Sequence, residues 1–425
     1  MRNAIVWGRL LGTVNTIVES LDFEREPQRD PGTDERDDIV IIANVRPRKG
    51  ARGRCPHCGR RGAKFDNGGG RRRWRALDLG TIRAYLQAEA PRITCRTHGV
   101  VVAAVPWARP GARHTLAFDQ QAAYLATHTA KSTVGELMRV SWRTVGAILE
   151  RVWADVEEHT DLLSGLRRIG IDEVAYKKGH KYLVVVVDHD TRRLVWAGIG
   201  RERATLQRFF DQLGPERAKE ITHISADAAS WIENVAGANC PQALVCTDPF
   251  HVVAWATEAL DRVRRGIWNR LRRGHQLDPK AVPMQRVRFA LWKNPENLTD
   301  NQRGALARIE RDHPTLHRAY LLKEALRAIF HLDDPTDVET TLAHWLAWAQ
   351  RSRIPEFVEL AQRVRRHRHT IAAAVRERLS NGLIESTNTK IRLMTRIAYG
   401  FRDPDALIAL AMLTLGGHRP TLPGR

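Results

Sequence analysis

The sequence predicts a multidomain α/β protein, and three observations support this class. Two short cysteine-containing motifs lie among brief strand patterns near the N-terminus. Three strands followed by alternating helices and strands occupy about 168–248. A helical pattern then runs from about 252 to 378. With 425 residues, the chain is long enough for about two to four domains. We expect five consecutive segments, at 1–110, 111–160, 161–251, 252–378 and 379–425.

The composition combines an ordinary hydrophobic content with a large excess of positive charge. There are 68 Lys and Arg against 48 Asp and Glu, a formal net charge of +20. Such an excess most often indicates a polyanionic partner such as nucleic acid, although a generally arginine-rich proteome would also produce it. No apolar run approaches the roughly 20 residues that cross a bilayer, and the five cysteines do not suggest a secreted disulfide framework. We therefore expect a cytoplasmic protein with no membrane partner.

Segment 1–110 contains two metal-binding motifs. One is Cys-Pro-His-Cys and the other Cys-Arg-Thr-His, and each two-residue gap lets both outer side chains turn toward one ion. Three thiolates and one imidazole complete a tetrahedral shell, which predicts one structural Zn²⁺ without a catalytic water. The predicted ligands are Cys55, Cys58, Cys95 and His98, with His57 as an alternative to Cys58.

Between these motifs, an arginine cluster surrounds Trp74. Arg71, Arg72 and Arg73 precede this tryptophan, an arrangement suited to contacts with DNA phosphates. The same cluster could also be an ordinary solvated loop.

Segment 111–160 shows two short helical patterns that meet near residues 139–141. The expected helix contact brings Val134, Leu137 and Met138 against Val145, Ile148 and Leu149. Ser141 is a plausible N-cap for the second helix, which presents Trp142 and Arg143 at its start. The recognition helix of a helix-turn-helix reads base edges from this position, although any helical hairpin gives a similar pattern.

Segment 161–251 begins with a strand at 168–176, the buried strand YLVVVVD and a third strand RRLVWAGIG. A helix, a strand ending at Asp227, another helix and a strand ending at Asp248 follow. Three antiparallel strands and then helix-strand-helix-strand is the order of an RNase H-like fold. No G-x-G-x-x-G sequence follows a strand, which argues against dinucleotide binding.

Three carboxylates are candidates for a metal centre in this fold. Asp172 lies in the first strand and Asp227 at the tip of its neighbour, so the two should converge and repel each other unless a divalent cation lies between them. Glu385, on an otherwise polar and cationic helix face, can supply a third ligand for two metal sites about 4 Å apart. Asp172 and Asp227 are 55 residues apart, whereas 158 residues separate Asp227 from Glu385, which predicts a helical insertion at 252–378.

Several sequence blocks carry a family resemblance. One set of blocks is GIDE, SAD, DPFH and NGLIESTNTKIR…AYGF, and the other is CPHCGRRG…WRALDLG…CRTHG…VPWAR. Both sets resemble the ISL-three family of bacterial insertion-sequence transposases. The resemblance runs through essentially the whole chain. It implies a DDE catalytic domain in which Asp172, Asp227 and Glu385 use two Mg²⁺ (or Mn²⁺) ions to cut and rejoin double-stranded DNA.

The resemblance also implies partners. The zinc module and helix-turn-helix would bind terminal inverted repeats in the bacterial nucleoid, and joining two DNA ends to target DNA requires a homodimer or larger synaptic complex. A non-catalytic DNA-binding regulator and an RNase H-like nuclease or resolvase are the alternatives.

Other residues near this site have less definite roles. Asp248 and His251 match a [C/D]-x2-H pair of related superfamilies, so we expect them to support the site or the DNA end, with Asp248 as the rival second carboxylate. Arg392 could hold a terminal phosphate. Between Arg262 and Lys293 the chain has ten Lys or Arg and one acid, which predicts a DNA-facing surface; it includes Arg264, Arg265, Arg272 and Arg273.

Overall fold

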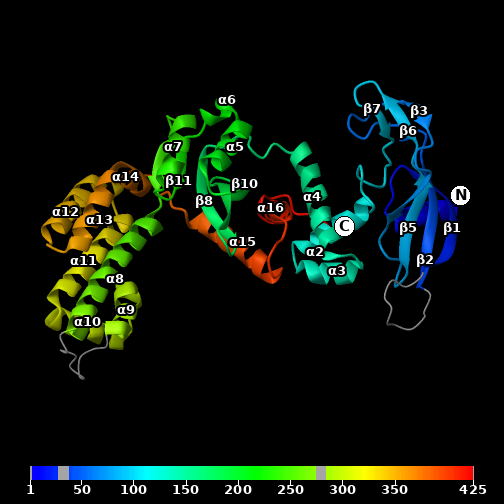
Figure 1. The fold of residues 1–425 in the computed structure, drawn as a ribbon. Coiled ribbons are helices and arrows are strands. Elements are labelled where there is room, and N and C mark those ends of the chain that lie inside the picture. Colours follow the sequence, from blue (N-terminus) through cyan, green and yellow to red (C-terminus); the bar gives the residue numbers. More distant parts are fainter. Residues whose placement is uncertain (1, 27–37, 274–283, 425) are drawn as a thin grey trace. The chain divides into compact units, whose positions relative to one another are not determined.

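The computed structural model describes residues 2–26, 38–273 and 284–424. These residues form two compact units, one from residues up to 161 together with 393 onward, and one from 162–392. Each unit is described by itself below, with the elements labelled as in Figure 1. Among the described residues, no helix has the length and apolar character needed to cross a membrane.

The first unit begins with helix α1 (Arg2–Leu10) and contains two small sheets. One has the order β1-β2-β5-β4 and the other β3-β6-β7. The first sheet packs Trp74 against Trp107 in its core, with ring centroids 5.5 Å apart. The strands are β1 (Thr16–Glu26), β2 (Asp38–Pro47), β3 (Ala63–Asp66), β4 (Arg71–Arg75), β5 (Arg83–Glu89), β6 (Arg92–Cys95) and β7 (Gly99–Val102).

The predicted helix pair is present in the same unit. Helix α2 (Leu116–Ala126) is followed by α3 (Lys131–Met138) and α4 (Trp142–His159), and α16 (Pro404–Leu415) packs against α4. Arg139 has a left-handed conformation that ends α3, and the Ser141 side chain accepts a hydrogen bond from the backbone N–H of Thr144. The N-cap prediction is thus confirmed.

The turn between α3 and α4 requires a small residue. A Cβ atom at Gly135 would lie 2.7 Å from the carbonyl oxygen of Val140, so only glycine lets the turn close this tightly. The expected packing is confirmed for Val134 and Met138 but wrong for Leu137, which is 59% exposed. Leu137 lies on the outer face of a helix that is only two turns long, so its side chain points to solvent.

The second unit is built on a five-stranded sheet with the order β10-β9-β8-β11-β12. Strands β8 (Arg168–Lys177), β9 (Lys181–Asp188) and β10 (Arg193–Ile199) are antiparallel neighbours. Strands β11 (His223–Ala226) and β12 (Leu244–Thr247) continue the sheet in parallel with β8. The sheet is accompanied by α5 (Arg203–Leu213), α6 (Pro215–Ala218) and α7 (Ser230–Asn239).

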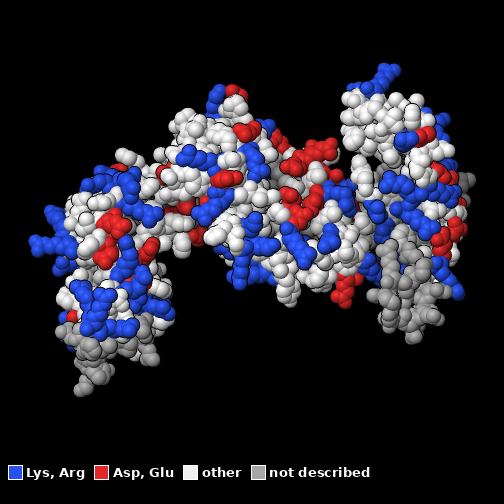
Figure 2. Space-filling model, viewed as in Figure 1, with Lys and Arg blue, Asp and Glu red and all other residues white. Residues whose placement is uncertain are grey.

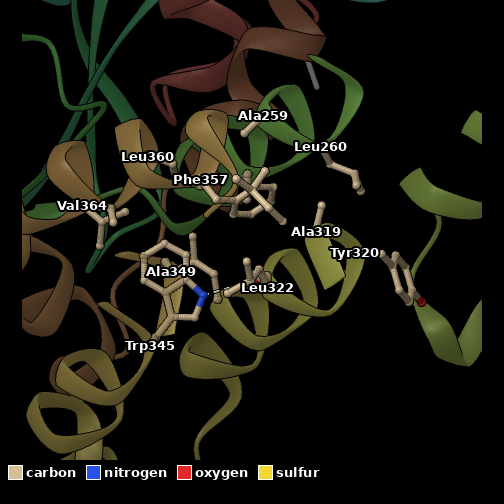
Figure 3. Packing of buried hydrophobic residues seen from close by; sticks show 14 of the residues in the cluster. Ala259, Leu260, Ala319, Tyr320, Leu322, Trp345, Ala349, Phe357, Leu360 and Val364 are labelled. Carbon is tan, nitrogen blue, oxygen red and sulfur yellow. Dashed lines mark hydrogen bonds between the residues drawn. The ribbon is translucent and has the colours of Figure 1, made fainter. Parts of the chain in front are cut away.

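Between β12 and the helix that carries Glu385, the part of the chain that the structure describes contains helices joined by short loops and no strand. Its core is formed by side chains such as Phe357, Leu360 and Trp345, and the indole of Trp345 donates a hydrogen bond to the carbonyl oxygen of Leu322 at 2.9 Å (Figure 3). The elements are α8 (Pro249–Arg273), α9 (Met284–Trp292), η1 (Pro295–Asn297), α10 (Asp300–Asp312), α11 (Pro314–Ala328), η2 (Ile329–His331), η3 (Pro335–Asp337), α12 (Val338–Arg351), α13 (Pro355–Arg366), α14 (Arg368–Arg376) and α15 (Gly382–Ile397).

Candidate active site

The first candidate carboxylate, Asp172, lies within β8 and is held from two sides. Its Oδ1 accepts a hydrogen bond from the backbone N–H of Glu173 at 2.7 Å, and its Oδ2 accepts one from Nδ2 of Asn388 at 2.8 Å. Asn388 belongs to α15, which therefore lies beside β8 (Figure 1). Burial raises the pKa of Asp172 to about 6, and the negative charge of Asp227 acts in the same direction.

Asp227 follows β11 directly, and the strand register places it next to Asp172. Ala226 pairs with Ile171 in the parallel β8–β11 ladder, so the next residue of each strand is one of the two aspartates. The Asp227 side chain is half-buried, and the backbone N–H of Ala229 donates to its Oδ1 at 3.2 Å. Its Oδ2 has no hydrogen-bond donor within the described ranges, so this carboxylate has capacity for a cation.

Asp248 differs from Asp227 because its carboxylate is almost fully used within the protein. It is 2% exposed, and its Oδ2 lies 2.8 Å from Nδ1 of His251. The backbone N–H groups of Phe250 and Asn381 both donate to its Oδ1 at 3.3 Å. The hydrogen bond to Asp248 raises the pKa of His251, and the carboxylates of Asp227 and Asp172 raise it further. These contacts favour the protonated form of His251.

Glu385 lies in the first turn of α15 and is half-buried. Burial raises its pKa, as does the charge of Asp248, while His251 and Arg392 lower it. The charges of Asp248 and His251 thus act on both Glu385 and Asp172. The carboxylates gather around one end of the sheet, where hard oxygen donors of this kind suit Mg²⁺ or Mn²⁺.

The cysteine–histidine cluster is more tightly assembled. The ligand atoms of Cys55, Cys58, Cys95 and His98 all lie within 4.8 Å of one another, the only group of three or more potential metal ligands that close together in the described part of the chain. Two of the separations, Cys58 Sγ to Cys95 Sγ and Cys55 Sγ to His98 Nδ1, are 3.6 Å. This spacing fits a tetrahedral ion with Zn–S bonds of about 2.3 Å. His57, the alternative ligand, is outside the group, although its ring lies 5.1 Å from that of His98.

Three family comparisons match these features in chain order. Residues 51–98 match the zinc-finger of transposase IS204/IS1001/IS1096/IS1165, residues 103–153 match the helix-turn-helix domain of transposase family ISL3, and residues 169–411 match the transposase domain of that family. The chain belongs to the ISL3 family of transposases.

Two curated relatives agree with the ISL3 assignment. The transposase for insertion sequence element IS1557, from two strains of Mycobacterium tuberculosis, is 54% identical over 100% of this chain and 98% of its own length. The transposase for insertion sequence element IS1001 of Bordetella parapertussis is 31% identical over 79% of this chain and 82% of its own. The resemblance drawn from the sequence blocks is confirmed.

The residues expected to contact DNA lie in varied environments. Arg71 and Arg73 alternate with Arg72 along β4 and form ion pairs with Glu89 and Glu24, while Arg72 lies over Trp74. Trp142 is 40% exposed at the start of α4, with the cationic groups of Lys131, Arg143 and Arg402 over its ring.

On α8, Arg264 is 7% exposed and pairs with Asp261, which also pairs with Arg265. Arg272 and Arg273 are exposed at the end of this helix, and residues 274–283 of the same basic segment lie outside the described residues. On the face drawn in Figure 2, Lys and Arg side chains gather over the helical section. Because Arg264 is buried and paired with Asp261, we do not expect it to contact DNA.

Two groups near the carboxylates escaped the sequence reasoning. Asn388 lies three residues beyond Glu385 on the same helix, and this spacing was the available signal. The second group is the guanidinium of Arg363, which lies 3.8 Å from the ring centroid of Trp255. Asp248 lies just before α8, and His251 and Trp255 lie on it. The helical spacing of the three residues could have placed Trp255 on the same face of the helix as Asp248 and His251.

Proposed function

We propose that this ISL3-family transposase binds the terminal inverted repeats of its insertion sequence and catalyses metal-dependent cleavage and strand transfer of DNA. The observation that carries the proposal is the register of β8 and β11, which brings Asp172 and Asp227 together, combined with the contact of the Glu385 helix with Asp172. Carboxylates that converge from separate elements favour a role in holding cations over a purely structural role.

The topology supports an RNase H-like catalytic domain. Three antiparallel strands and two parallel ones in the order β10-β9-β8-β11-β12 are the arrangement of that fold. The helical section from α8 to α14 has its own core and separates β12 from α15, which supports an insertion at 252–378. We retain the division into 1–110, 111–160, 161–251, 252–378 and 379–425 as a proposal.

Asp172, Asp227 and Glu385 would hold two Mg²⁺ or Mn²⁺ ions, which when bound activate water and stabilise the leaving oxygen. The unused Oδ2 of Asp227 makes it a better ligand than Asp248, whose oxygens already accept three hydrogen bonds. Asp248 instead fixes His251 and favours its protonated form, which would suit contact with a DNA phosphate. Cleavage frees a 3′-hydroxyl at the element end, and this hydroxyl then attacks target DNA.

The remaining modules would bind DNA. The Cys3His cluster would hold one structural Zn²⁺, and α4 would present Trp142 and Arg143 to the terminal repeat. We assign Arg71, Arg72, Arg73, Arg265, Arg272 and Arg273 to phosphate contacts and Arg392 to the region of the DNA end. Because two ends must be joined, the reaction would take place in a homodimer or larger complex in the nucleoid.

The test is a reaction of purified protein with DNA carrying the element ends, Mg²⁺ and a target plasmid. Wild-type protein should cleave and join the ends, and Glu385→Gln should bind the ends but form no product. Glu377→Gln is a matched control, because this exposed glutamate pairs with His223 at the surface. End binding without cleavage would indicate a regulator, and cleavage without joining would indicate a nuclease.

A further inference from the structure

Asn388 connects the helix of Glu385 to the strand of Asp172. It lies three residues beyond Glu385 on α15, and its Nδ2 donates to Oδ2 of Asp172 at 2.8 Å. The residue is 2% exposed. No other side chain in the described ranges donates a hydrogen bond to this carboxylate.

The two hydrogen bonds that Asp172 accepts come from separate parts of the chain, and together they restrict the orientation of its carboxylate. The donor to Oδ1 is a backbone group of β8, and the donor to Oδ2 comes from a helix 216 positions away in the sequence. A carboxylate oxygen has about two lone-pair sites, so each oxygen retains one for a cation. The hydrogen bonds thus fix the plane of the carboxylate and leave its metal-binding capacity intact.

The other polar atom of Asn388 is unsatisfied. Its Oδ1 is buried and has no hydrogen-bond partner among the residues that the structure describes. A buried acceptor without a donor destabilises the folded state, so a purely structural role would favour an apolar residue of similar shape at this position. An open acceptor next to a metal-binding carboxylate is, in contrast, well placed for a water molecule that enters with an ion.

We infer that Asn388 is a positioning residue, which holds Asp172 in its metal-binding orientation and sets the register of the Glu385 helix against β8. The inference rests on the proposed metal site of Asp172, Asp227 and Glu385. It predicts that loss of the amide weakens metal binding even where the fold is unchanged, because residues that orient metal ligands contribute about 10- to 100-fold to affinity.

The test measures Mn²⁺ binding directly, by electron paramagnetic resonance titration of the full-length zinc-loaded protein without DNA. Asn388→Leu keeps the branched shape and removes the donor, and it should bind Mn²⁺ about 10- to 100-fold more weakly while melting within a few degrees of wild type. If Asn388→Leu does not fold, Asn388→Ala carries the same expectation. Thr387→Val is the matched control, since this adjacent buried hydroxyl donates only within the helix, to Leu383.

An Asp172→Ala variant distinguishes failure of the proposed metal site from failure of the role proposed for Asn388. If wild-type protein binds no more Mn²⁺ than Asp172→Ala, the proposed metal site itself is wrong. If wild-type protein binds Mn²⁺ and Asn388→Leu binds it equally well, the metal site stands and the role of Asn388 is overturned. A lower melting temperature with unchanged Mn²⁺ affinity would also overturn it, because only a structural role would then remain.

Discussion

At the scale of single residues, the carboxylates of this transposase are held at a cost to stability. Asp172 is half-buried beside Asp227, and desolvation with the charge of Asp227 raises its pKa to about 6 from an ordinary value of 3.8. The folded protein therefore binds this proton more tightly than the unfolded chain does. Without metal, stability should fall as the pH rises from about 4 to about 6, because the proton is then lost from the folded state.

The variant Asp172→Asn removes this cost. Above pH 6 it should raise the free energy of unfolding of the metal-free protein by up to about 3 kcal/mol, since folding raises the pKa of Asp172 from 3.8 to about 6. It should also abolish DNA cleavage. Denaturant unfolding in EDTA at pH 4 and pH 7, for wild type and variant, measures the difference. Equal pH dependence in the two proteins would show that Asp172 is not the titrating group.

The residue scale also shows the limits of sequence reasoning. The convergence of Asp172 and Asp227 could be anticipated, because each residue is placed by a strand and strand neighbours follow from the order of elements. The roles of Asp248 and His251 stayed open in the sequence, since a strand end does not reveal how many hydrogen bonds a carboxylate accepts. The contact between Asn388 and Asp172 depends on how α15 packs against β8, which no local pattern specifies.

At the scale of elements, the zinc module depends on its ligands for a core. The small cluster of buried residues here consists of Cys55, Ile93, Cys95 and Ala103, so half of it is ligand cysteine. Cys58→Ala should lose zinc and unfold this module, whereas His57→Ala should retain both zinc and fold. Zinc content by atomic absorption and proteolysis of residues 51–104 test this pair. Zinc loss in His57→Ala alone would reverse the ligand assignment.

The recognition helix should depend on its N-cap. Ser141→Ala removes the hydrogen bond to the Thr144 N–H and should lower stability by about 1 kcal/mol, whereas Ser141→Asp should keep the cap. Arg143→Ala should leave stability unchanged and weaken binding to the element ends. Thermal unfolding and gel-shift titration distinguish the two effects. A stability loss in Arg143→Ala without weaker DNA binding would argue against α4 as the reading helix.

The element scale was the most predictable from sequence. The two helices, the cap, the strand order and the helical section after Asp248 all follow from periodicity and turn residues. Leu137 shows the limit, because a two-turn helix has too few residues for its apolar spacing to define which side is buried.

At the scale of the whole molecule, the helical section contributes a cation near the carboxylates. Arg363 lies over Trp255, and burial lowers its pKa while the charges of Glu258 and Asp227, among others, raise it. A guanidinium that lies over an indole can still donate its N–H groups to a phosphate. We expect Arg363→Ala to reduce cleavage at least tenfold, with Arg311→Ala on α10 as the exposed control. Equal rates of end cleavage in the two variants would contradict a role for Arg363.

The central claim, that Asp172, Asp227 and Glu385 hold the metals while Asp248 supports them, is tested most directly by one comparison. Asp227→Ala and Asp248→Ala are assayed side by side for cleavage and joining of the element ends with Mg²⁺. We predict no product with Asp227→Ala and a reduced yield with Asp248→Ala. If Asp227→Ala retained activity and Asp248→Ala alone abolished it, the second carboxylate would be Asp248 and the assignment made here would be wrong.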